Sequence, residues 1–331
     1  MSSRMKWNET EDAAVWDGFT RTKAQGTIYD SWKWRNVLES QGHRPIYLLA
    51  TDARGAVQGC CPFYYERYRG PTWMLTTWPE YSEPSGPLFS PEASSRASEL
   101  VESLLHSIPT SISLAGIHIR TTNKNIADYL SKSGVRIHDS AGFFLVDLQE
   151  TPPETIRAKF FKKHERQTLR YFEENDLNVS VTGDQRSIEE FHALYSQSML
   201  RKGYAVEPLP FLTAVSKEFQ DSFKILFVRT RAAKAAGALL LDRDRGTVHL
   251  MQVGYERPPS HSILLFSDWV TMNWARENGF RFINMGNGSS NPNHANFRSK
   301  KRFGGAFVTR YWCNIYLSPL VRGLRSILGR R

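Results

Sequence analysis

Basic and aromatic residues gather near the C-terminal end of the chain, where the sequence reads Phe297-Arg-Ser-Lys-Lys-Arg-Phe-Gly-Gly305. Residues 278–331 hold ten Lys or Arg and no acid, a count equal to the formal net charge of +10 for the whole chain. A cationic loop directly after an apolar strand (280–286) suits a polyanionic ligand, because neutralising several phosphates releases counterions. The alternative is a solvated basic face. The flanking Phe297 and Phe303 and the two glycines favour a binding site.

Polar side chains also lie on or just after strands that are expected to be buried. These are His249, Gln252, Asn284 and Asn287. An unpaired polar atom in a core is costly, so each of them either binds a ligand or satisfies the local backbone. No Gly-x-Ser-x-Gly motif occurs, and no cysteine sits in a recognisable site context. The sequence therefore favours chemistry without a covalent enzyme intermediate.

Length and composition set the class of protein. A chain of 331 residues exceeds what one core usually holds, so two domains are expected. No run approaches the ~18 apolar residues of a membrane-spanning helix, and the first residues lack the apolar core of a secretion signal. Cys60 and Cys61 are adjacent and Cys313 stands alone, which is neither a disulfide framework nor a metal-ligand spacing. We expect a reduced, cytosolic protein without a metal.

The pattern of the first half predicts alternating helices and strands, as in an α/β fold. We expect helices over 29–40, 94–107 and 123–132, and strands over 45–51, 56–65, 111–118, near Val135 and over 142–148. The stretch 73–91 contains four prolines and is too irregular for a long element, so we expect a functional or packing loop there.

The second half repeats that order, which predicts two similar modules, 1–150 and 151–317. We expect helices over 153–175, 187–201, 208–220 and 261–278, and strands over 177–181, 223–230, 235–241, 247–254, 280–286 and 306–316. We expect residues 318–331 to form a basic amphipathic helix, which fits a membrane surface and fits docking on its own domain as well.

The helix over 153–175 carries a basic stripe. Lys159, Lys163, Arg166 and Arg170 recur at helical spacing, with Lys162 beside them. Such a stripe suits a tRNA acceptor stem or membrane phosphates, and the alternative is a solvated helix face.

The second half carries a resemblance to a known family. Two segments resemble the C-terminal module of the Fem family, the non-ribosomal peptidyl transferases that add amino acids to peptidoglycan precursors: Trp269-Val-Thr-Met-Asn-Trp-Ala-Arg-Glu-Asn-Gly-Phe-Arg-Phe-Ile-Asn-Met-Gly286 and Lys300-Lys-Arg-Phe-Gly304. The basic helix around 162–170 and the helix and turn over 195–203 are similar to the first elements of that module. The resemblance covers residues 25–315.

The resemblance implies an α/β (α+β) fold of two GNAT-like acyltransferase modules, each a mixed, mostly antiparallel sheet flanked by helices. It implies direct transfer of an aminoacyl or other acyl group onto an amine. Lys300 would stabilise the negative charge on the carbonyl oxygen or the leaving ribose. Arg298 and Arg302 would hold donor phosphates, with Phe303 beside them. The alternative for Arg302 is an ion pair with a nearby carboxylate.

The resemblance also implies groups that hold the acceptor, an amine of a cell-envelope precursor or a small molecule. Arg201 and Tyr204 lie on either side of Gly203, where a helix ends, and would grip the acceptor's phosphate or peptide. A cation at a helix C-terminus is favoured by the helix dipole in any case. Tyr255 would hydrogen-bond the acceptor, or it packs.

Aminoacyl-tRNA is the favoured donor, with no tightly bound cofactor. Acyl-CoA enzymes of this fold hold pyrophosphate on a glycine-rich turn at a helix start. The corresponding stretch here, 255–262, has no glycine and two prolines, which lack the N–H group. One alternative is an acyl-CoA-dependent N-acyltransferase acting on an amino sugar in polysaccharide biosynthesis. The other is a non-catalytic protein that binds RNA or a membrane surface.

Overall fold

The computed structural model describes residues 5–22, 26–68, 71–77, 83, 86–108, 114–256 and 262–317. The chain divides into two compact units. Unit 1 takes the described residues within 1–140 and 309–331, and unit 2 takes residues 141–308. This division differs from the expected one at residue 150, and it moves 309–317 into unit 1, because the last strand pairs there. The expected helix over 318–331 lies outside the described residues.

Unit 1 is an α/β layer structure whose strands follow the order β1-β2-β3-β4-β6-β13, with β5 beside β3. Its elements are β1 (Lys6–Glu9), α1 (Ala13–Thr22), the 3₁₀ turn η1 (Ile28–Asp30), α2 (Trp32–Ser40), β2 (Arg44–Thr51), β3 (Val57–Arg67), β4 (Trp73–Thr76), β5 (Leu88–Phe89), η2 (Ser94–Arg96), α3 (Ala97–Ser107), β6 (Leu114–Thr121), α4 (Lys124–Lys132) and the last part of β13 (Ala306–Tyr316). The β13 strand pairs antiparallel with β6, from Tyr311 opposite Thr121 to Tyr316 opposite Gly116.

Unit 2 has the strand order β7-β12-β11-β10-β9-β8. Its elements are β7 (His138–Asp147), α5 (Pro153–Thr155), the π-helical turn η3 (Ile156–Phe160), α6 (Lys163–Glu173), β8 (Asn178–Thr182), α7 (Gln185–Lys202), α8 (Leu209–Phe219), η4 (Gln220–Ser222), β9 (Phe223–Arg229), β10 (Lys234–Asp242), β11 (Thr247–Tyr255), α9 (Ile263–Glu277), β12 (Phe282–Ser289) and α10 (Ala295–Lys301). The β11–β12 pair is parallel, whereas β8 through β11 pair antiparallel, as do β12 and β7.

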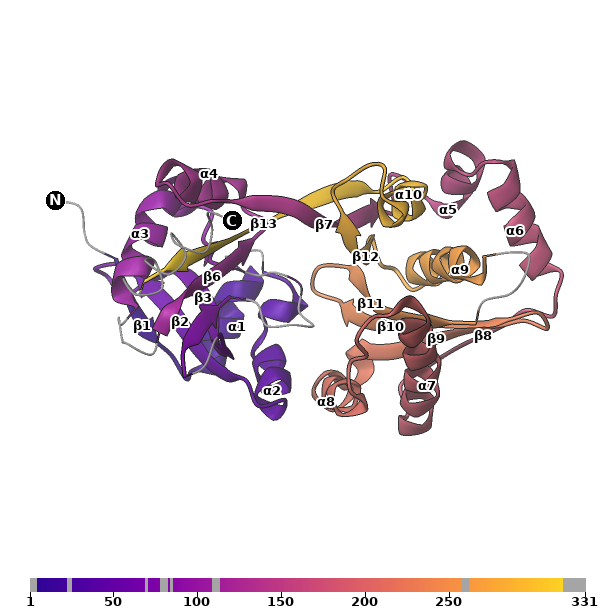
Figure 1. The fold of residues 1–331 in the computed structure, drawn as a ribbon, viewed down its shortest axis with the longest axis horizontal. Helices are drawn as coiled ribbons and strands as arrows, with labels where there is room; N and C mark the ends of the chain where they lie inside the picture. The colour runs from indigo at the N-terminus through magenta and orange to yellow at the C-terminus, as the bar shows by residue number, and fades with distance from the viewer. Residues whose placement is uncertain are drawn as a thin grey trace. The chain divides into compact units, whose positions relative to one another are not determined.

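Helices cover both faces of the unit 2 sheet, with α9 on one face and α7 and α8 on the other (Figure 1). Apolar residues of α9 pack with Leu239 of β10 and Val248 of β11 in one continuous core. On the other face α7 lies directly on β11, because a Cβ at Gly254 would come within 2.5 Å of the backbone nitrogen of Tyr195. Glycine at 254 is therefore a condition for this helix–strand contact.

The predicted helix over 153–175 is broken, which is a correction to the sequence analysis. The π-helical turn η3 ends at Phe160, and α6 begins only at Lys163. The break lets the ring of Phe161 enter the core, where it lies 5.4 Å from Phe303 and 5.6 Å from Trp269. The Glu165 carboxylate then accepts the N–H of Lys162 at 2.6 Å and starts the new helix. Hydrophobic burial outweighs helix continuity here.

Three other predicted elements differ. The stretch 73–91 contains the short strands β4 and β5, and 135–137 is not a strand. The segment expected as a cationic loop is the helix α10 through Lys301, in which the His294 side chain accepts the N–H of Asn296. The other expected helices and strands are present within a few residues of the predicted bounds.

The three cysteines are buried free thiols. Among the described residues, no helix has the length and hydropathy to cross a membrane. Nor do those residues bring three or more His, Cys, Asp or Glu together as a metal site.

Candidate functional site

Two parallel strands of unit 2 part from one another. β11 and β12 pair only where Thr247–His249 face Phe282–Asn284. Beyond that point β11 continues to Tyr255 and β12 to Ser289 without pairing with each other (Figure 1). Diverging strands leave backbone N–H and C=O groups that amide groups of a ligand can satisfy. The carboxyl ends of parallel strands are also where ligands bind in open α/β sheets. We call this point the strand divergence.

A glycine lies where the two strands separate. Gly286 has a φ of +70°, and a Cβ there would lie 2.9 Å from the carbonyl oxygen of Leu250. Its N–H donates to Oδ1 of Asn284 at 2.8 Å. Glycine therefore lets β12 turn close to β11 without a steric clash.

Lys300 reaches the strand divergence from α10. Its ammonium donates to the carbonyl oxygens of Met285 and Asn287 at 2.5 and 2.6 Å, on either side of Gly286. The sequence analysis selected both Lys300 and Asn287. The structure brings them together through the Asn287 backbone, while the Asn287 side chain is exposed. The ammonium is thus fixed in position by the protein, as electrostatic stabilisation of a reaction requires.

Asp268 of α9 was missed by the sequence analysis. It lies on the buried stripe of the helix, three residues after Leu265 and four before Met272, both of which are buried. Its own side chain is half-buried. Burial raises the pKa of Asp268 to about 7, against the opposing effect of Lys300 and then Arg302. The sequence could have indicated Asp268, because it places an acid at a helical position where apolar residues are expected.

Arg302 and Phe303 have partners within the protein. The Arg302 guanidinium lies 3.6 Å from the buried carboxylate of Glu165 and donates to the carbonyl of Ser299 at 2.8 Å. The structure thus agrees with the alternative given for Arg302, an ion pair with a nearby carboxylate. Phe303 is fully buried against Phe161 and offers no surface to a ligand, in contrast to its expected role.

The polar residues of β11 and β12 divide into two kinds. The Asn284 amide donates to Nδ1 of His249 at 3.3 Å, and both side chains are buried. Burial lowers the pKa of His249 to about 3. The Asn284 side chain also accepts the Gly286 N–H, so it binds groups of the protein itself. Gln252, in contrast, has a buried Oε1 atom without a hydrogen-bond partner in the described structure. An unpaired acceptor beyond His249, the last residue of β11 that pairs with β12, suits an N–H group of a ligand.

The expected acceptor residues gather where α7 ends beside β11. The Ser198 hydroxyl bonds to both the N–H and the carbonyl of Tyr255, at 2.7 and 2.8 Å. Arg201 donates to the same carbonyl, and the Lys202 ammonium lies 4.9 Å from the Tyr255 ring. Burial, followed by the charge of Arg201, lowers the pKa of Lys202. Tyr204 is 64% exposed. Arg201 and Tyr255 are thus together, and Tyr204 extends into solvent.

A basic surface runs along η3, the start of α6 and α10. The Phe160 ring lies over Gly304, and Arg302 joins Glu165, so these segments pack together. Five exposed or half-exposed cations on them make no ion pair in the described part of the chain: Lys159, Lys162, Lys163, Arg298 and Lys301. Phe160 itself is 42% exposed. We call these five residues the cationic face.

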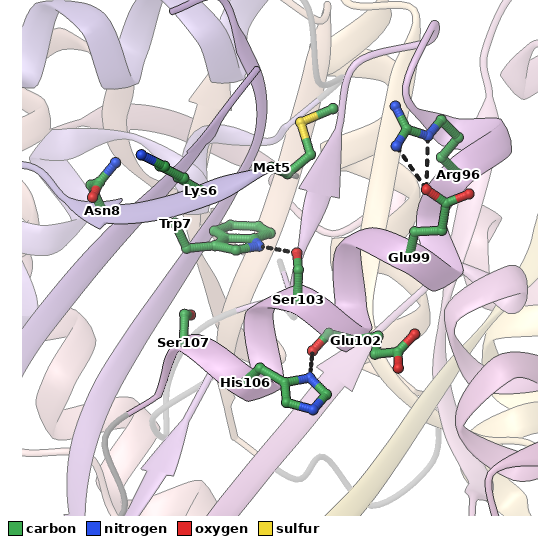
Figure 2. Close-up of a pocket in the computed structure, with 10 residues that line it drawn as sticks. All are labelled: Met5, Lys6, Trp7, Asn8, Arg96, Glu99, Glu102, Ser103, His106 and Ser107. Atoms are coloured by element: carbon green, nitrogen blue, oxygen red, sulfur yellow. Dashed lines mark hydrogen bonds and ion pairs between the residues drawn. The ribbon is translucent and has the colours of Figure 1, made fainter. Parts of the chain in front are cut away.

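Unit 1 contains a cavity of about 730 Å³ between β1 and α3 (Figure 2). The Trp7 indole N–H donates to the Ser103 hydroxyl at 2.9 Å across it. Arg96 pairs with Glu99 at 2.7 Å within the wall. No residue of this wall was a sequence candidate.

Comparison with known proteins identifies the class of fold. Residues 158–294, most of unit 2, match the family model described as an acetyltransferase (GNAT) domain. No curated protein matches the sequence.

Solved structures resemble the whole chain. FemX matches with a TM-score of 0.70 at 10% identity, covering 98% of this chain and 99% of FemX. The C-terminal domain of a predicted lysylphosphatidylglycerol synthetase from Agrobacterium fabrum matches with a TM-score of 0.55 at 14% identity, over 96% and 95% of the two chains. A GNAT-family acetyltransferase from Colwellia psychrerythraea matches with a TM-score of 0.55 at 10% identity, over 94% and 99%.

The chain therefore has a GNAT-type acyltransferase fold. The prediction of two GNAT-like modules with mixed, mostly antiparallel sheets flanked by helices is confirmed. The resemblance to the Fem family agrees with the likeness to FemX at the level of the fold.

Proposed function

We propose that the protein is an acyltransferase that moves an aminoacyl or other acyl group directly onto an amine at the strand divergence of unit 2. The observation that carries this proposal is the ammonium of Lys300, fixed at 2.5 and 2.6 Å on the carbonyls of Met285 and Asn287 where β11 and β12 part. Strands that no longer pair with each other and a preorganised cation at one point suit an acyl carbonyl that becomes an oxyanion.

Lys300 stabilises the charge of the transition state in this mechanism. Its ammonium is held by the Met285 and Asn287 carbonyls, and its positive charge serves the developing oxyanion or the leaving oxygen. The attacking amine forms the new C–N bond as the bond to the carrier breaks; the amine gives up a proton and the leaving group takes one up. Gln252 Oε1, unpaired on β11, accepts an N–H of donor or acceptor.

Aminoacyl-tRNA is the proposed donor, supported by the cationic face and by the likeness to FemX. Unpaired cations beside an exposed Phe160 suit a nucleic acid, because phosphates bind the cations and a base stacks on the ring. The glycine-poor turn after Tyr255, which disfavours CoA, falls largely on 257–261, outside the described residues. The proposal of a tRNA donor therefore depends on the cationic face.

The proposed acceptor is an amine of a cell-envelope precursor, held near Arg201 and Tyr255. The Tyr255 hydroxyl makes no hydrogen bond in the described part of the chain, and Arg201 and Lys202 form no ion pair there. An anionic group of an acceptor fits beside these two cations. The segment 318–331 adds a proposed contact with the membrane surface, which sedimentation with anionic vesicles tests by comparison with a chain truncated after 317.

The test is a transfer assay with the purified chain. Labelled aminoacyl-tRNA and labelled acetyl-CoA are each incubated with amine acceptors, including amino sugars and peptidoglycan precursors. We expect transfer from aminoacyl-tRNA and its loss in Lys300→Met. Absence of transfer and of binding with both donors would overturn the proposal and favour a non-catalytic RNA- or membrane-binding protein.

A second candidate function is acyl-CoA-dependent N-acylation of an amino sugar. The match of residues 158–294 to an acetyltransferase (GNAT) domain favours it. Mass spectrometry of small molecules that co-purify with the chain separates the candidates, because bound CoA supports this one and disfavours tRNA dependence.

A further inference from the structure

Asp268 occupies a position that stability alone disfavours. It lies between Leu265 and Met272 on the stripe of α9 that packs on the sheet, half-buried in an otherwise apolar row. It makes no hydrogen bond and no ion pair in the described structure. Burying a carboxylate without such partners is costly, and Leu would avoid the cost. An acid retained at such a position is a candidate for chemistry.

The charged surroundings of Asp268 come from two neighbouring elements. Lys300 of α10 and Arg302, which follows it, are close enough to act on the Asp268 carboxyl. Glu165 of α6 lies 3.6 Å from Arg302 and holds part of that charge. Lys300 also bonds to β12 at the strand divergence. The Lys300 ammonium therefore lies near Asp268 and at the point where the acyl carbonyl is proposed to bind.

We propose that Asp268 is the proton acceptor for the attacking amine, an inference that rests on the proposed function. The acceptor arrives as an ammonium ion and transfers one proton to the Asp268 carboxylate, leaving a neutral amine. The amine attacks the acyl carbon, the C–N bond forms, and the bond to the carrier oxygen or sulfur breaks. Asp268 then returns its proton to the leaving group, while the second amine proton goes to water. Burial favours this cycle, since it raises the pKa of Asp268 to about 7, close to the pH at which a general base is most effective.

The first test needs no activity. Carboxyl ¹³C shifts of aspartate-labelled full-length chain are followed with pH, and the Asp268 signal is assigned by its loss in Asp268→Asn. We expect a midpoint near neutrality, whereas a midpoint below about pH 5 would overturn the proposal. In thermal unfolding, Asp268→Asn should raise Tm more at pH 8 than at pH 4. Asp221→Asn, at a 99% exposed side chain of the same unit, is the matched control and should show no such difference.

The second test is single-turnover transfer from labelled aminoacyl-tRNA or acetyl-CoA. We expect Asp268→Asn to slow transfer at least about 100-fold with donor binding unchanged and the acid limb of the pH–rate profile lost. Asp268→Glu should restore part of the rate. If the wild-type chain transfers and Asp268→Asn transfers equally with the same pH profile, this assignment alone is overturned. If the wild-type chain transfers nothing, the proposed function is overturned together with it.

Discussion

Lys300 donates to the carbonyl of Asn287 at 2.6 Å and to that of Met285 at 2.5 Å, so one side chain holds β12 on both sides of Gly286. A cation placed this way has a structural role and, in the proposed function, a chemical one. It satisfies carbonyls that leave the sheet ladder, and it presents a positive charge where β11 and β12 separate. The two roles are separable by measurement.

Replacing Lys300 by Met should lower the free energy of unfolding by about 3 kcal/mol or more, because it removes two hydrogen bonds to a charged group, each worth ~1.5–3 kcal/mol. It should also abolish acyl transfer at temperatures where the variant stays folded. Urea unfolding and the transfer assay measure the two effects. Lys217→Met, on an exposed position of α8, is the control and should change neither. A stable but inactive Lys300→Arg would assign the loss to geometry rather than charge.

Gly286→Ala should destabilise the protein more than Gly279→Ala. Both glycines have positive φ, +70° and +80°, so both changes carry a backbone penalty of about 1–2 kcal/mol. Only at 286 would the new Cβ meet an atom, the Leu250 oxygen at 2.9 Å, whereas nothing lies within 4 Å at 279. The difference between the two variants in chemical denaturation isolates the cost of forcing the strands apart. Equal losses would contradict the close approach of β12 to β11.

Removing cations from the cationic face should weaken binding of RNA. In Lys159→Ala/Lys163→Ala the dissociation constant for tRNA should rise, and the slope of log affinity against log salt should fall by about 2 in magnitude, since each phosphate contact contributes ~0.7–0.9. Fluorescence anisotropy over a salt series measures both. Lys217→Glu changes charge on α8, on the other face of the sheet, and should leave the slope unchanged. An unchanged slope in the double variant would place the RNA elsewhere.

His249 should make the protein less stable in acid. Its folded-state pKa of about 3 lies below the ordinary value of 6.5, because burial disfavours the charged ring. As pH falls below 6.5 the unfolded chain takes up a proton that the folded chain refuses until about pH 3, so stability is lost across that window. The loss is on the order of 1.4 kcal/mol per pH unit. His249→Gln should flatten the dependence of unfolding free energy on pH between these limits. His106→Gln, at an exposed site, should not.

The sequence was informative wherever one periodicity governed a segment. The hairpin β9–β10 and the strand β11 alternate or are continuously apolar between turns, and they lie within two residues of the prediction. The helix over 153–175 could not be predicted, because burial of Phe161 against Phe303 breaks it, and that contact joins residues 142 positions apart. Tertiary packing overrides local propensity in such cases.

The candidate site was predictable in part. The basic cluster after β12 located Lys300, but its bonds to Met285 and Asn287 depend on α10, which the sequence analysis took for a loop. The Arg302–Glu165 pair and the burial of Phe303 depend on α6 packing beside that helix. Asp268 could have been noticed as an acid on an apolar stripe. Its partners across the fold could not.

The pairing of β13 with β6 has a consequence for biosynthesis. Unit 1 is completed by Tyr311–Tyr316, which lie about 190 positions after Gly116–Thr121 in the chain. Unit 2 is therefore synthesised before β13 can pair with β6 and complete the sheet of unit 1. Until β13 is made, one edge of β6 stays uncovered, so chaperones or stalled translation at that stage would meet an incomplete sheet in unit 1.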